Sequence, residues 1–64
     1  DRQVREALDG LPSEYRAVLV MKEIDGHKYE TIAQMLDCPI GTVRSRLHRA
    51  RLELRERLRH LMEE

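Results

Sequence analysis

Four arginines fall within eleven residues of this 64-residue chain, from Gly41 to Arg51, and no acidic residue lies among them. Guanidinium groups bind phosphate oxygens, and their planar fork also pairs with the O6 and N7 atoms of guanine. Short hydroxyl side chains and one imidazole stand between the arginines. The candidate residues of this stretch are Thr42, Arg44, Ser45, Arg46, His48, Arg49 and Arg51. Their chemistry suits a phosphate-bearing polymer.

Apolar residues in the same stretch predict a helix with one buried side. Val43, Leu47, Ala50 and Leu54 are spaced i, i+4, i+7 and i+11, which places them on one helical face. The cationic residues between them must then face away from the core. A helix that is anchored on one side and cationic on the other has the shape needed to enter a DNA groove. A solvated cationic face without a ligand is the alternative interpretation.

Two helices are expected before the middle of the chain. Residues 1–9 have an apolar side, and Gly10 is placed to end that helix. Pro12 suits the first turn of a second helix, because its missing N–H leaves no hydrogen bond unmade there. Asp25 and Gly26 are expected to end the second helix.

The third and fourth helices are expected to form a helix-turn-helix. A third helix is predicted from Tyr29 to Leu36, and Pro39 cannot continue it. The turn 37–40 is too short to form a longer loop, so the fourth helix must cross the third at a steep angle. Gly41 and Thr42 open this fourth helix, which has no break signal afterwards. The expected fold is all-α, with four helices, a homeodomain-like or winged-helix-like three-helical core and no strands.

The second helix is apolar around more than half of its circumference, because residues 17–21 are apolar without a break. Burial between neighbouring helices is one interpretation. A docking surface for another protein is the other. The candidate partner-binding residues are Leu11, Tyr15, Val18, Leu19 and Met21.

Length and composition limit the other possibilities. The 64 residues suffice for one small domain, predicted to span 1–64, and the missing initial Met suggests a fragment of a longer chain. The net charge of zero hides a division: residues 1–40 carry five Lys or Arg and eight Asp or Glu, whereas residues 41–64 carry seven Arg and four Glu. The basic field is therefore local to the fourth helix, which is typical of a partner that touches one face.

No sequence pattern indicates catalysis, a cofactor or a metal. Cys38 and the three histidines lack ligand spacing, and no nucleophile has a base at recognisable spacing. No apolar run approaches the roughly 20 residues that span a bilayer. A single cysteine fits a reducing compartment. We therefore expect a cytoplasmic protein that is not an enzyme and has neither a small-molecule substrate nor a membrane partner.

The order of elements and several runs of residues closely resemble region four of bacterial sigma factors, especially the extracytoplasmic-function (ECF) group. The resemblance covers about residues 8–58. It is carried by residues 11–16 (LPSEYR), 23–26 (EIDG), 29–33 (YETIA) and 38–51 (CPIGTVRSRLHRAR).

This resemblance implies a domain that reads the promoter −35 element in the major groove while bound to the flap of the RNA polymerase β subunit. It also implies an anti-sigma factor as a possible partner. Base-reading and phosphate-binding roles would fall on Arg44, Ser45, Arg46, His48 and Arg49. Backbone contacts would fall on Pro39, Thr42 and Lys22, and Tyr29 and Glu30 would lie near the backbone of the other strand.

Lys28 departs from the family pattern. Many relatives have a serine there and a glutamate three residues later, which together form a capping box. A cation at a helix N-terminus opposes the helix dipole. We therefore expect Lys28 to reduce helix stability and to contact a phosphate.

Three alternatives remain open from the sequence. A response regulator or quorum-sensing activator has an output domain with four helices and a similar Thr-Val-basic motif, but it usually dimerises on inverted half-sites. A protein-interaction module would act mainly through the polymerase flap or an anti-sigma factor. A coiled-coil dimer is suggested by Leu47, Leu54 and Leu61, which are seven residues apart.

Overall fold

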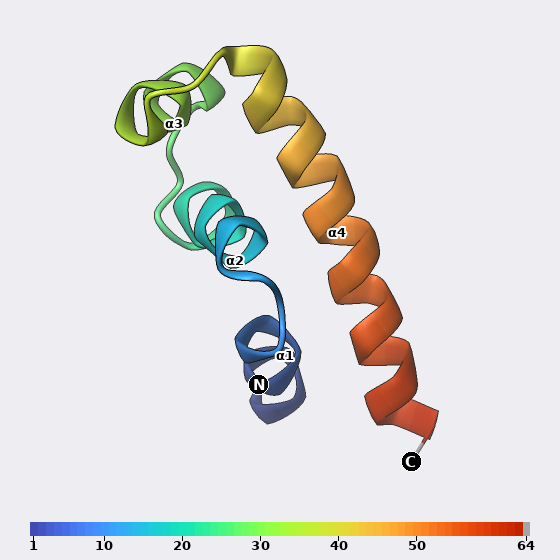
Figure 1. The fold of residues 1–64 in the computed structure, drawn as a ribbon. Coiled ribbons are helices and arrows are strands. Elements are labelled where there is room, and N and C mark those ends of the chain that lie inside the picture. Colours follow the sequence, from blue (N-terminus) through green and yellow to red (C-terminus); the bar gives the residue numbers. More distant parts are fainter. Residues whose placement is uncertain (64) are drawn as a thin grey trace.

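One long helix supports three short ones. The computed structural model describes residues 1–63 and contains α1 (Arg2–Asp9), α2 (Ser13–Leu19), the π-helical turn η1 (Val20–Ile24), α3 (Tyr29–Leu36) and α4 (Ile40–Glu63). Figure 1 shows α1, α2 and α3 one after another along the length of α4. Residues 1–63 contain no strand. The all-α class and the four α-helices are therefore confirmed.

The core lies where the short helices meet the inner face of α4. It is built from Leu11, Val18, Leu19, Ile32, Val43, Leu47 and Ala50. Val43 is 0% exposed and Leu47 is 1% exposed, so the predicted apolar stripe does anchor α4. Because Leu47 is buried within the monomer, the seam suggested by Leu47, Leu54 and Leu61 cannot form a coiled-coil dimer in this fold.

The sequence suggested an α-helix that continues to Ile24, but the α-helical part of this segment ends at Leu19. From Val20 it becomes a π-helix, in which the Asp25 N–H donates to the Val20 carbonyl at 2.9 Å. In a regular α-helix, Lys22 and Glu23 would lie one turn beyond Val18 and Leu19 and on the same face as these two buried residues. The wider π turn changes that register: Lys22 is half-buried and Glu23 is exposed.

Left-handed residues separate the helices on both sides of α3. Gly26 has φ +74° in the connection after η1, a conformation that glycine adopts without steric strain. Asp37 has φ 52° and ends α3, and the Cys38 N–H donates to the Ala33 carbonyl at 3.0 Å. The chain turns from α3 into α4 (Figure 1), and α4 begins at Ile40, one residue earlier than predicted. The helix-turn-helix is therefore present.

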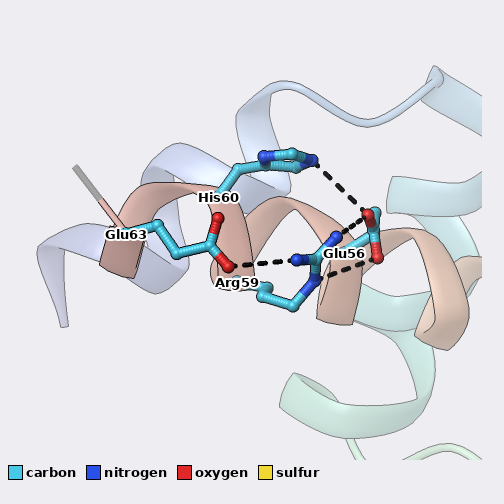
Figure 2. Close-up of polar contacts among 4 residues, drawn as sticks. All are labelled: Glu56, Arg59, His60 and Glu63. Atoms are coloured by element: carbon cyan, nitrogen blue, oxygen red, sulfur yellow. Dashed lines mark hydrogen bonds and ion pairs between the residues drawn. The ribbon is translucent and has the colours of Figure 1, made fainter.

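The C-terminal half of α4 packs back toward the other helices. Leu54 contacts the core cluster, and α4 also contacts α1. Its last turns carry a surface ion-pair group, in which Arg59 lies between Glu56 and Glu63 and His60 stands 3.4 Å from Glu56 (Figure 2).

Among residues 1–63, no helix combines the length and the apolar character needed to cross a membrane.

Candidate nucleic-acid interface

The first turns of α4 present cationic and hydroxyl side chains away from the core. Arg44, Ser45, His48 and Arg49 are exposed. They lie away from Val43, Leu47 and Ala50, because those three residues hold the opposite face against the core. This exposed set is called the α4 face below.

The arginines near the start of α4 are not held by acids. Within residues 1–63, ion pairs connect Arg51 to Glu23 and tie Arg59 and His60 to carboxylates near the C-terminus. Arg44, Arg46 and Arg49 take part in none of them. Their guanidinium groups are therefore available to phosphates or base edges from outside.

A polar depression lies beside the α4 face, where the start of α2 approaches the start of α4. It is lined by Glu14, Tyr15, Gly41, Thr42, Ser45, Arg46 and Arg49. Ser45 and Arg49 connect the depression to the α4 face, and Thr42 and Arg46 extend it toward α2. Glu14 is the one acid in this lining. Sequence reasoning missed it, because the approach of α2 to α4 carries no local signal.

A second group of cations gathers at the start of α3. Lys28 occupies the N-cap position in extended conformation, and its side chain makes no capping hydrogen bond. The Lys22 ammonium stands 5.2 Å from the centre of the Tyr29 ring, which is a cation–π distance. Two lysines therefore border the start of α3, one as its N-cap residue and one over the ring of its first residue. Such a helix terminus favours an anion.

Arg51 differs from the other predicted DNA-binding arginines. Its Nη2 atom donates to Glu23 Oε1 at 2.7 Å. Hydrogen bonding to Glu23, followed by hydrogen bonding to Tyr29, raises the pKa of Arg51. Glu23 was not predicted as a neighbour of the site. Glu23 and Arg51 are 28 residues apart in sequence, so the spacing of residues within one helix could not indicate that they form an ion pair.

The predicted partner-binding set requires a correction. Leu11, Val18 and Leu19 are at most 4% exposed and belong to the core, so they cannot contact another protein in this fold. Tyr15 and Met21 are half-buried. Burial therefore accounts for most of the apolar circumference of α2.

Other apolar side chains remain exposed and were not predicted as a site. Ile24 is 67% exposed at the end of η1, and Met62 is 72% exposed near the end of α4. Leu54, Leu58 and Met62 line a shallow apolar depression with Arg51, Arg55 and Arg59. Spacing of i, i+4 and i+8 places these three apolar residues along one side of α4.

Cys38 and Pro39 lie in the turn before α4. Cys38 is half-buried against the core and is a free thiol, whereas Pro39 is exposed. In the part of the chain that the structure describes, no three His, Cys, Asp or Glu residues lie close enough together to hold a metal ion.

Comparison with known proteins connects this geometry to a family. Residues 1–54 match the model of the family "Sigma-70, region 4". An ECF RNA polymerase sigma-E factor of Haemophilus influenzae is 39% identical over 62 residues, which are 97% of this chain and 33% of that protein. Sigma-E factors of Salmonella typhimurium LT2 and Escherichia coli K12 are each 48% identical over 48 residues, which are 75% of this chain and 25% of each relative.

The chain thus spans a quarter to a third of the length of these curated relatives. The family match covers α1, α2, η1 and α3 completely and extends into α4 as far as Leu54. The chain belongs to the sigma-70 region 4 family.

Proposed function

We propose that this chain recognises the −35 element of promoters as the DNA-binding domain of an RNA polymerase sigma factor. The observation that carries the proposal is the α4 face, where Arg44 and Arg49 are exposed and no carboxylate within residues 1–63 pairs with them. Membership in the sigma-70 region 4 family supports the same function. The role is one of binding, without catalysis, in the cytoplasm.

Recognition begins when the first turns of α4 enter the major groove. Arg44 and Arg49 are long enough to reach guanine O6 and N7, and each good bidentate contact gives about 1–3 kcal/mol of discrimination. Ser45 lets the helix approach closely. His48 contacts a base edge or a thymine methyl.

Phosphate contacts surround the base-reading residues. Arg46 and Thr42 flank them at the depression beside α2, and Pro39 lies on the approach to the backbone. On the other strand, a phosphate binds at the start of α3, where Lys22, Lys28 and Tyr29 meet the unpaired N–H groups of the helix. Such contacts set orientation and register.

The chain acts as a single domain of a longer sigma factor. Its share of the length of its relatives, whose names identify them as RNA polymerase sigma factors, supports this part of the proposal. The partners would be the polymerase β flap and an anti-sigma factor. The exposed Ile24 and Met62, together with the half-buried Leu58, Tyr15 and Met21, offer apolar contacts for such proteins.

Selection from a pool of random DNA duplexes tests the proposed function. The 64-residue chain should recover one short asymmetric sequence, since a sigma domain does not need inverted half-sites. Arg44→Ala and Arg49→Ala should each weaken binding to that duplex by about fivefold to a hundredfold, the equivalent of losing one bidentate contact.

Arg55→Ala is the matched control. Arg55 is an exposed arginine on the same helix, and no ion pair holds it within residues 1–63. It should leave the affinity for the selected duplex unchanged. A pool without enrichment would refute the proposed function, and an inverted repeat would favour the dimeric output domain.

A further inference from the structure

One ion pair joins the end of the second helix to the middle of α4. Arg51 and Glu23 meet at 2.7 Å although 28 residues separate them in sequence. Both side chains remain about half exposed. Such a pair contributes little to folding free energy, so its geometry requires an explanation beyond stability.

The π turn accounts for how Glu23 reaches Arg51. Glu23 follows the buried Leu19 by four residues, which in a regular α-helix would direct it toward the core. The π-helical segment Val20–Ile24 alters that register and leaves Glu23 exposed beside α4. Single π turns occur frequently at functional sites.

Lys22 belongs to the same turn and faces the start of α3. Its ammonium lies over the Tyr29 ring at 5.2 Å. Lys22 and Glu23 are adjacent in the π turn, so this one turn carries both the contact with Tyr29 and the ion pair with Arg51.

We propose that Glu23 and Arg51 are positioning residues, whose ion pair holds the π turn so that Lys22 stays over Tyr29 at the phosphate site of α3. This inference rests on the proposed DNA-binding function and refines it. Arg51 acts through Glu23 and does not itself hold a phosphate, in contrast to the expectation from the sequence. Lys22 is the group that reaches the DNA.

When the charge of Glu23 is removed, the direction in which DNA affinity changes separates this inference from simple electrostatic repulsion. An acid beside DNA repels phosphates, so removing it should strengthen binding if it had no other role. A positioning role for Glu23 predicts the opposite. Glu23→Gln releases Arg51 and the π turn, and Lys22 then loses its fixed place.

Asp25→Asn is the matched control, because Asp25 is an exposed acid two residues away with no ion pair in residues 1–63. Both variants lose the same formal charge. Binding to the duplex recovered from the random pool is measured by fluorescence anisotropy across a salt series, with thermal unfolding recorded in parallel.

Glu23→Gln should bind about threefold to tenfold more weakly than the unsubstituted chain, the equivalent of one hydrogen bond. Its plot of log affinity against log salt should become shallower by about 0.9, which corresponds to one phosphate contact. Asp25→Asn should bind as tightly as the unsubstituted chain or more tightly. A Glu23→Gln variant that binds as well as Asp25→Asn would overturn the inference.

A charge exchange tests the role assigned to Arg51. Arg51→Glu alone should weaken binding, and Glu23→Arg with Arg51→Glu should restore both affinity and salt slope, because the exchanged pair again holds the turn. If Arg51 itself bound a phosphate, the exchanged chain would stay as weak as Arg51→Glu, and the inference would be wrong. If the unsubstituted chain fails to prefer the selected duplex over a scrambled one, the proposed function fails instead.

Discussion

Arginine side chains on α4 differ in whether a carboxylate of the same chain holds them. Arg51 and Arg59 are paired with glutamates, whereas Arg44 and Arg49 take part in no ion pair within residues 1–63. A guanidinium that is paired with a carboxylate gains less free energy from binding a phosphate, because the phosphate must first displace that carboxylate. The division therefore separates arginines that are available to an external ligand from arginines that are already engaged within the chain.

At Lys28, the residue that suits the proposed phosphate contact is unfavourable for the stability of α3. It occupies the N-cap of α3 without a capping hydrogen bond. Lys28→Ser would supply that bond and remove a cation from the positive end of the helix, and should raise the free energy of unfolding by about 1 kcal/mol. For a domain of this size, such a gain corresponds to roughly 4–8 °C in the unfolding midpoint.

The same substitution should weaken the salt dependence of DNA binding, since one phosphate contact is lost. The slope of log affinity against log salt should become shallower by about 0.9. Lys28→Ala separates the two effects, because it removes the charge without creating a cap. An unchanged salt slope in Lys28→Ser would show that Lys28 does not contact the DNA backbone.

At the scale of elements, α4 is both the proposed recognition helix and the support for the whole fold. Its N-terminal turns carry the α4 face, and its last turns carry the ion-pair group of Glu56, Arg59, His60 and Glu63 (Figure 2). Hydrogen bonding to Arg59 lowers the pKa of Glu56. Because a lowered pKa in the folded state favours the ionised carboxylate, this group stabilises the end of α4 at neutral pH.

That stabilisation should depend on pH in a definite direction. It is fully present above the ordinary pKa of glutamate, about 4.3, and is lost as pH falls through the lowered value. Glu56→Gln should therefore reduce the unfolding midpoint slightly at pH 7 and leave it unchanged at about pH 2. The effect is small because the group is exposed.

Glu53→Gln is the control for this measurement, since Glu53 lies on the same helix outside the ion-pair group. Thermal unfolding followed by circular dichroism at both pH values gives the comparison. An equal loss at low and neutral pH would mean that Glu56 stabilises α4 by some means other than its charge.

The sequence predicted the elements better than the contacts between them. The spacing of Val43, Leu47 and Ala50 was sufficient to predict the buried face of α4, because a helix has a fixed period. The π turn at Val20–Ile24 could not be predicted in this way, since it is defined by hydrogen-bond register and the apolar pattern of residues 17–21 fits an α-helix equally well.

Site contacts between distant segments were also beyond the sequence. The pairing of Glu23 with Arg51 depends on how η1 crosses α4, and the approach of Glu14 to Arg46 and Arg49 depends on where α2 begins. The burial of Leu11 likewise follows from tertiary packing.

At the scale of the whole molecule, the domain is long and narrow. Its extents are 39 × 19 × 15 Å, because α4 runs the full length. Figure 1 shows that α4 begins beside α3, and the α4 face lies in these first turns.

The arginines in the first turns of α4, which no carboxylate of residues 1–63 pairs with, predict strong salt dependence of DNA binding. If four to six phosphates are engaged, log affinity should fall with log salt with a slope of about −4 to −5. Arg46→Ala should make the slope shallower by about 0.9, and Arg55→Ala should not change it. A slope near zero would mean that these arginines do not bind the DNA backbone.

Protection of guanine N7 from methylation is the most direct test of the claim that the α4 face reads bases, because N7 is exposed only in the major groove. In a duplex selected by the chain, guanines of one asymmetric site should be protected. Arg44→Ala or Arg49→Ala should remove protection at particular guanines, while Arg55→Ala leaves it complete. Protection that persists in both Arg44→Ala and Arg49→Ala, or that never involves N7, would contradict the account.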